Sequence, residues 1–268
     1  MRGVIFISDA RMEYAAGYLA GKGIGITSLY AGELNEQMGN VEAAALDFAV
    51  LPVRGAQNGL MEMEGQIVDG TRLFMALPER ALLFTGYETP YLKQLPQEVI
   101  NYVRCSEQGR RVNSRLAAEG VLYLLLGKTP ESLFDYSYDL LGMGYTGQEI
   151  YKLLTGLGIK VRTVDRTPGK AELTVGQWQS RTPSRIIINT IPVLTVTMPV
   201  LERCVPGSVV LDISSARAGT DARAAGMKNL TYLPAPGLPG LVAPETEGRS
   251  MAKTILEVMT RKEKEAGR

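Results

Sequence analysis

The sequence Leu140-Leu141-Gly142-Met143-Gly144-Tyr145-Thr146-Gly147 contains the pattern G-x-G-x-x-G, and nothing else in the chain competes with it. Residues 136–141 before the glycines have the composition of a strand, and the apolar residues of 148–158 after them recur at helical spacing. A second strand, 159–164, ends at Asp165. Strand, glycine turn, helix, strand and acidic residue form the context in which this pattern binds a dinucleotide.

Each glycine of the pattern has a physical task. Gly142 permits the tight turn, Gly144 lets the backbone approach a pyrophosphate, and Gly147 lets the helix pack closely on the strand. The helix start offers free N–H groups and the positive end of its dipole to that anion. The alternative is a structural turn without a ligand. We predict that the turn binds a cofactor through a continuous run of residues: Gly142, Met143, Gly144, Tyr145, Thr146 and Gly147.

The choice between NAD and NADP stays open. Asp165, at the end of the second strand, can accept hydrogen bonds from a ribose 2′-OH and repel a 2′-phosphate. Arg166 beside it can instead hold that phosphate. We therefore expect NADP or NAD as the cofactor, and we expect loss of the Asp165 carboxylate to favour NADP.

Composition limits the classes of function. The chain has 268 residues, 45% of them hydrophobic, and a net charge of +1, which is enough for two α/β domains and gives no case for nucleic acid. It lacks an apolar run of transmembrane length and a signal peptide, so a cytoplasmic protein without membrane partners is expected. Cys105 and Cys204 lie too far apart in sequence for a disulfide framework or a metal cluster, and we expect both in the core and no metal.

The absence of histidine is the feature of the composition that excludes the most kinds of catalytic site. With no histidine in the chain, a Ser-His-Asp triad, a Cys-His pair and a histidine-ligated zinc are all excluded. Any general acid or base must be Asp, Glu, Lys, Tyr or Cys, unless the substrate supplies its own proton chemistry.

The N-terminal part alternates short apolar strands with helices or loops, which is typical of a parallel sheet. Ser8 or Asp9 can cap a helix over 10–20. Residues 54–70 are rich in glycine, and we expect a loop there. A helix over 114–126, capped by Asn113 or Ser114, is expected to bridge two domains. The strands expected before it cover 4–7, 26–29, 48–53, 81–86 and 99–103.

The C-terminal part continues the sheet around the glycine turn. Strands are expected at 185–189, 209–213 and 230–233, then a stiff extended loop over 234–246 and a terminal helix over 246–261. Since ligands sit at the carboxyl ends of parallel strands, four further cofactor contacts are expected at the same rim as the glycines: Thr190, Ile191, Pro192 and Ser214.

We thus predict a two-domain α/β protein. A flavodoxin-like α/β domain on the substrate side covers 1–128, and a Rossmann-type, doubly wound parallel sheet covers 129–268 and includes the terminal helix.

Several motifs resemble the family of the A subunit of dipicolinate synthase, over essentially the whole chain. The resemblance lies in 189–192, in 211–212 leading to 219–221, and in Ala-Pro-Gly-Leu-Pro-Gly at 235–240 with 242–244. In the N-terminal half it lies in the short motifs 9–11, 51–53, 113–114 and 119–120. The resemblance implies an oxidoreductase, a dipicolinate synthase that oxidises dihydrodipicolinate to dipicolinate with NAD(P) in the mother cell of a sporulating bacterium. It also implies that the partner is the B subunit of dipicolinate synthase; a homo-oligomer is compatible as well.

A dicarboxylate substrate needs a cationic partner, and Arg11 lies at the carboxyl end of the first strand, within a matching motif. We expect Arg11 to hold a substrate carboxylate between the domains, with Arg54 or Arg217 as substitutes; the alternative is a surface arginine. Glu119 is the candidate base, unless it is an ordinary helix-surface carboxylate. The expected substrate contacts are Arg11, Asn113, Gly237, Leu238, Pro239 and Thr246.

Two other classes of function stay open. One is a non-catalytic protein that binds NAD(P) or serves as a scaffold. The other is a different two-domain NAD(P)-dependent dehydrogenase; for the shikimate type, the lysine–aspartate pair is not evident in the sequence.

Overall fold

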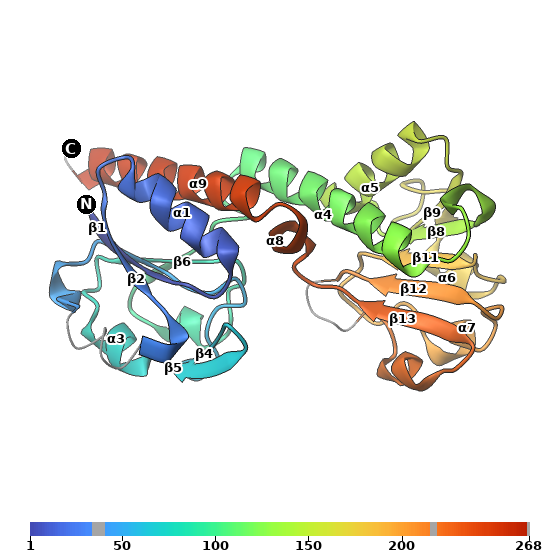
Figure 1. The fold of residues 1–268 in the computed structure, drawn as a ribbon, viewed down its shortest axis with the longest axis horizontal. Helices are drawn as coiled ribbons and strands as arrows, with labels where there is room; N and C mark the ends of the chain where they lie inside the picture. The colour runs from blue at the N-terminus through green and yellow to red at the C-terminus, as the bar shows by residue number, and fades with distance from the viewer. Residues whose placement is uncertain (34–40, 215–218, 267–268) are drawn as a thin grey trace. The chain divides into compact units, whose positions relative to one another are not determined.

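The structure is a computed structural model that describes residues 1–33, 41–214 and 219–266, and these residues form two units (Figure 1). The first unit comprises Met1–Val112 and Ala243–Arg268, and the second comprises Asn113–Val242. The expected boundary near 128 is therefore wrong. The division falls inside a long helix, α4 (Glu107–Lys128), whose start also precedes the expected cap at Asn113 or Ser114.

The first unit contains a parallel sheet of five strands in the order β2-β1-β3-β6-β7. This is the flavodoxin-like order that the sequence predicts. Asp9 caps the helix that follows the first strand, α1 (Ala10–Ala20), by accepting a hydrogen bond from the Arg11 N–H. The strands are β1 (Arg2–Phe6), β2 (Gly25–Leu29), β3 (Phe48–Val50), β6 (Leu82–Thr85) and β7 (Glu98–Asn101).

One face of this sheet is covered by α3 (Thr71–Ala76) and a hairpin of β4 (Leu60–Met63) and β5 (Gln66–Asp69). The hairpin lies where a loop was expected, so that expectation is wrong. Its inward residues, Met61, Met63 and Val68, alternate with exposed ones. Short 3-10 turns cover Ala31–Glu33, Ala43–Ala45 and Leu92–Gln94.

The opposite face is covered by α1 together with the terminal helix α9 (Pro244–Ala266), and the two run side by side in Figure 1. Met251, Ile255 and Met259 of α9 lie in one core cluster with Met12 and Leu19 of α1. This helix was expected in the second domain, and that expectation is wrong, because its apolar stripe is buried against the first sheet.

The second unit contains a parallel sheet of six strands in the order β10-β9-β8-β11-β12-β13. This is the order of a doubly wound dinucleotide-binding sheet, in which the strand order reverses between β8 and β11. The predicted Rossmann-type fold is confirmed. The strands are β8 (Tyr138–Leu141), β9 (Val161–Asp165), β10 (Leu173–Thr174), β11 (Ile186–Asn189), β12 (Ser208–Asp212) and β13 (Leu230–Pro234).

Helices cover both faces of this sheet. The C-terminal part of α4 and α5 (Tyr145–Gly156) pack on one face, and α6 (Val175–Gln179) and α7 (Met198–Leu201) pack on the other. Within the expected extended loop lies a short helix, α8 (Leu238–Val242), so that expectation is wrong in part. The 3-10 turns of this unit cover Leu133–Asp135 and Ala222–Gly226.

Cys204 is buried, but Cys105 is exposed, so only one of the two cysteines lies in the core. Across the described parts of the chain, no helix combines the length and the apolar character that crossing a membrane requires.

Candidate cofactor site

The glycine turn joins β8 to α5 at the carboxyl edge of the second sheet. Gly142 has a φ of 93°, in the region that side chains disfavour, and its N–H donates to the Val164 carbonyl over 2.7 Å. The hydroxyl of Thr190 lies 2.9 Å from the Leu141 carbonyl oxygen and 3.2 Å from that of Gly142. Thr190, one of the expected cofactor residues, thus holds the turn from the end of the neighbouring strand.

The start of α5 has the free space that an anion needs. Gly144 is the N-cap, and no side chain caps the helix. A Cβ placed on Gly144 would meet no other group within 4 Å, whereas one placed on Gly147 would collide with the Gly142 carbonyl. The uncapped N–H groups and the open surface at Gly144 therefore fit a pyrophosphate, while Gly147 is fixed by packing.

Asp165 ends β9 and is bonded to the glycine turn itself. Its Oδ2 accepts a hydrogen bond of 2.8 Å from the Met143 N–H, and its Oδ1 accepts one of 2.9 Å from the Thr167 N–H. Burial opposes the charged form, but these two N–H donors and the nearby Lys170 outweigh it, so the pKa of Asp165 is lowered. The Lys170 ammonium lies 3.7 Å from Oδ2. Asp165 therefore supports the turn and remains charged at neutral pH.

The neighbouring strands end in a second polar group. The Asn189 amide donates to the Ile191 carbonyl over 3.1 Å and lies 3.3 Å from Asp212 Oδ1. Asp212 Oδ1 also accepts a hydrogen bond of 2.9 Å from the Ser214 N–H. These side chains are buried at the carboxyl ends of β11 and β12.

The remaining expected cofactor residues are distributed around this edge. Ile191 is buried, and Tyr145, Arg166 and Pro192 are exposed. Thr146 lies 3.4 Å, hydroxyl to hydroxyl, from Ser114 of α4. The structure therefore places all twelve expected cofactor residues in the second unit, where the glycine turn, Asp165 and Thr190 are directly bonded to one another.

Arg11 lies in the first unit and is already paired. Its Nε and Nη2 donate to the two oxygens of Asp9 over 3.0 and 2.7 Å, and its Nη1 lies 3.2 Å from both oxygens of Glu247 in α9. Burial opposes the charge on Arg11, yet the two carboxylates raise its pKa. Burial also disfavours the charged form of Glu247 and so raises the pKa of its carboxyl group, although Arg11 opposes this shift. Tyr102 interacts electrostatically with these charged groups, and its hydroxyl has no hydrogen-bond partner among the described residues.

The other expected substrate or catalytic residues fall in both units. Glu119 is on the exposed side of α4, with Arg115 Nε 3.8 Å from its carboxylate. Asn113 lies inside α4, and Gly237 precedes α8. Leu238 and Pro239 are buried in the second unit, whereas Thr246 is exposed in the first turn of α9. Their role as substrate contacts stays a prediction.

Of the two substitute arginines, Arg54 is exposed and lies 2.5 Å from a carboxylate oxygen of Glu62. Arg217 lies outside the described residues.

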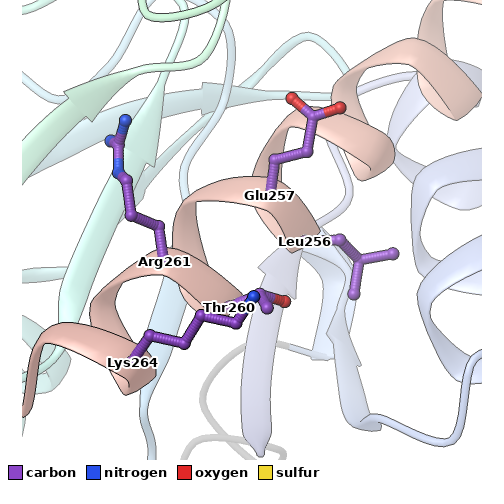
Figure 2. A pocket seen from close by; sticks show the side chains of 5 residues that line it. All are labelled: Leu256, Glu257, Thr260, Arg261 and Lys264. Carbon is purple, nitrogen blue, oxygen red and sulfur yellow. The ribbon is translucent and has the colours of Figure 1, made fainter.

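A pocket lies on α9 of the first unit. Figure 2 shows its lining on the surface of the helix, where Glu257 and Arg261 extend to one side and Leu256 to the other. It is shallow and open, and its charges have mixed sign, so nothing in it points to a particular ligand. The lining residues are Leu256, Glu257, Thr260, Arg261 and Lys264.

Sequence reasoning missed two charged residues of this structure. Glu247 was overlooked because the terminal helix was assigned to the other domain. Asp212 was recognised as part of a matching motif but not as a buried carboxylate. Its position as a carboxylate within the otherwise apolar run 209–213 was the available signal.

Comparisons with known proteins agree with the resemblance seen in the sequence. No family model matches the chain. The A subunit of dipicolinate synthase from Bacillus subtilis (strain 168) is 29% identical over 204 residues, which cover 71% of this chain and 69% of that protein. The resemblance to this subunit of dipicolinate synthase is thus confirmed.

Solved structures show the same fold. The crystal structure of the dipicolinate synthase A subunit from Bacillus halodurans has a TM-score of 0.85 at 24% identity and covers 96% of this chain and 97% of that one. A 3-phosphoglycerate dehydrogenase from Entamoeba histolytica, solved with bound NAD+, has a TM-score of 0.62 at 10% identity, covering 97% and 95%. At these identities the likeness concerns the fold, which is that of two-domain dehydrogenases.

Proposed function

We propose that this chain is an NAD(P)-dependent oxidoreductase that converts dihydrodipicolinate to dipicolinate during sporulation, together with a partner subunit. The observation that carries the proposal is the uncapped start of α5 at Gly144, which is open to an anion within a complete doubly wound sheet. The 29% identical relative suggests the substrate and the partner, since its name makes it one subunit of a dipicolinate synthase.

The reaction removes one hydride and one proton from the substrate ring. A bound nicotinamide cofactor supplies the hydride acceptor. Because the product is aromatic, the proton step needs little help from a strong base, which suits a chain without histidine. The protein has to hold the substrate and the nicotinamide in the geometry for hydride transfer and to match their charges.

The residues that would hold the cofactor are those at the carboxyl edge of the second sheet. The N–H groups at the start of α5 would bind the pyrophosphate, and Asp165 would support the turn that presents them. In that arrangement Asp165 would lie near the ribose, where its charge would favour NAD, while the exposed Arg166 and the nearby Lys170 would favour a 2′-phosphate. We therefore propose that both NAD and NADP bind.

Binding at Gly144 provides the test. Gly144→Val should leave the fold intact, because its backbone angles suit any residue and its Cβ has free space, but the side chain would fill the pyrophosphate position. Titration calorimetry with NADPH and NADH should show that measurable binding is lost. Gly156→Ala, in the same helix and equally free of contacts, is the matched control and should bind as the wild type does. Unchanged affinity in Gly144→Val would contradict the proposed site.

Turnover is tested separately. Hydride transfer from dihydrodipicolinate to NADP+ or NAD+, measured with the partner subunit present, should be detected by the absorbance of the reduced cofactor. Binding without turnover under these conditions would favour the alternative of a non-catalytic cofactor-binding or scaffolding protein.

A further inference from the structure

Three buried oxygen atoms on the last residue of β12 or on residues that follow it have no hydrogen-bond partner among the described residues: Asp212 Oδ2, Ser214 Oγ and Thr220 Oγ1. Their side chains are all at most 4% exposed. A buried polar group that stays unpaired costs about 1–3 kcal/mol, so three such groups among the residues that end or follow β12 indicate that this segment serves more than protein packing.

Asp212 stands out because its side chain is a carboxylate. Its Oδ1 has one short hydrogen bond, 2.9 Å from the Ser214 N–H, and a longer contact of 3.3 Å with the Asn189 amide. Within 1–33, 41–214 and 219–266, no cationic side chain pairs with it. Buried carboxylates normally have a cationic partner or bind a cation.

Asp139 in the same sheet shows what full compensation looks like. It is also fully buried, but it accepts hydrogen bonds from Arg162, Trp178 and Ser184, and the Arg162 guanidinium neutralises its charge. The sheet can therefore satisfy a buried carboxylate where it serves structure alone. Asp212 lacks such a partner, within the described part of the chain, at the edge where a ligand is expected.

The position of Asp212 in the sheet indicates which part of a cofactor it faces. A dinucleotide lies across the point where the strand order reverses, here between β8 and β11. Its adenosine half belongs with β9, which ends at Asp165, so its nicotinamide half belongs with β11 and β12. An oxidised nicotinamide ring carries a positive charge, and a reduced ring is neutral.

We propose that Asp212 supplies the counter-charge to the oxidised nicotinamide ring and so shifts the binding preference of this chain towards NAD(P)+ over NAD(P)H. The inference rests on the proposed function. The carboxylate needs no contact with the ring, since a charge in a low-dielectric surrounding acts over several ångströms. Asp212 is thus a residue that sets preference for a redox state, and the Ser214 and Thr220 hydroxyls keep its surroundings polar.

The test compares two affinities in one variant. Calorimetric dissociation constants for NADP+, NADPH, NAD+ and NADH are measured for the wild type and for Asp212→Asn, which keeps an oxygen for the Ser214 N–H. The ratio of oxidised to reduced affinity should fall by about ten-fold, through weaker binding of the oxidised form. Asp221→Asn is the matched control, because Asp221 lies nearby in sequence but its charge is paired with Arg223 over 2.7 Å; its ratio should not change.

An unchanged ratio in a folded Asp212→Asn protein would overturn the inference and leave the proposed function intact. A wild type that binds none of the four cofactors would overturn both. If Asp212→Asn does not fold, Asp212→Ser, which also keeps an oxygen for the Ser214 N–H, gives the same ratio test.

Discussion

Asp139 shows how one side chain can join several elements of the second unit. It is fully buried in β8, and its two oxygens accept five hydrogen bonds. Two come from Arg162 of β9, one from Trp178 of α6, and two from Ser184, which precedes β11. The carboxylate therefore fixes three segments that are separate in the sequence.

Replacing this carboxylate should be costly. Asp139→Asn leaves the half-buried Arg162 without its charged partner and replaces one of the two accepting oxygens by an NH2 donor that faces other donors, so we expect the free energy of unfolding to fall by about 3 kcal/mol. Trp178 is the only tryptophan of the chain, so urea unfolding can be followed by its fluorescence. Asp221→Asn, at an exposed pair, should change the same quantity by less than about 1 kcal/mol. Equal stabilities for both variants would argue against this role.

Variants of Arg11 and Glu247 can distinguish a structural role of Arg11 from a role in substrate binding. Arg11→Met should lower stability by about 3 kcal/mol at pH 7, because it leaves Glu247 buried and charged without a partner. The double variant Arg11→Met with Glu247→Leu removes both charges and should recover most of that loss. If Arg11 also holds the substrate, the double variant regains stability but not kcat/KM. Recovery of both would make Arg11 a structural residue only.

The pH dependence of this pair has a definite sign. Burial raises the pKa of Glu247 in the folded protein above its ordinary value, so the folded state binds its proton more readily than the unfolded state. The contribution of Glu247 to stability is therefore fully present below its unfolded pKa and is lost as the pH rises through the folded pKa. Without Arg11 the loss should be larger, so the Arg11→Met penalty in urea unfolding should shrink as the pH is lowered. A penalty that stays constant with pH would contradict this account.

At the scale of elements, α9 completes the core of the first unit. Five of its side chains are buried in the cluster shared with α1 and one face of the sheet: Met251, Ala252, Ile255, Val258 and Met259. Burying a large apolar side chain contributes roughly 1.5–3 kcal/mol, and whole domains are stable by only about 5–15 kcal/mol. The first unit therefore depends on a helix that follows the whole second unit in the sequence.

A chain that ends at Val242 should lose the folded first unit and keep the second. Hydrogen exchange should show unprotected amides in β1 and β3, while the unfolding transition reported by Trp178 remains. A chain ending at Lys262, which keeps the five buried side chains, is the control and should protect both units. Protected β1 amides in the shorter chain would contradict the dependence on α9.

Elements were easier to predict than their partners. The helix over 10–20 and its Asp9 cap follow from local signals, and the structure has both. The β4–β5 hairpin was missed although Leu60–Met63 alternates exposed and buried residues. Its turn places Glu64 at φ 49° and Gly65 at φ 77°, and glutamate is an unusual residue in that region, so the turn lacked its normal signature.

At the scale of the whole molecule, the sequence by itself determined the two parallel sheets and the cofactor edge. The pattern consists of the glycines, the apolar strands beside them and Asp165, which lie within about 25 residues of each other. Such a local pattern can be recognised directly in the sequence. The periodicity of α9 showed that one of its faces is apolar, but not which sheet that face covers. That was decided by tertiary packing.

The tertiary structure also decided how the buried charges are paired. Arg11 meets Glu247 across 236 positions of sequence, and Asp139 meets Ser184 across 45. No local pattern encodes such a pair, because the partners come together only when separate elements pack on the same sheet. For the same reason the lack of a partner for Asp212 Oδ2 among the described residues, on which the proposed redox preference rests, became visible only in the folded chain.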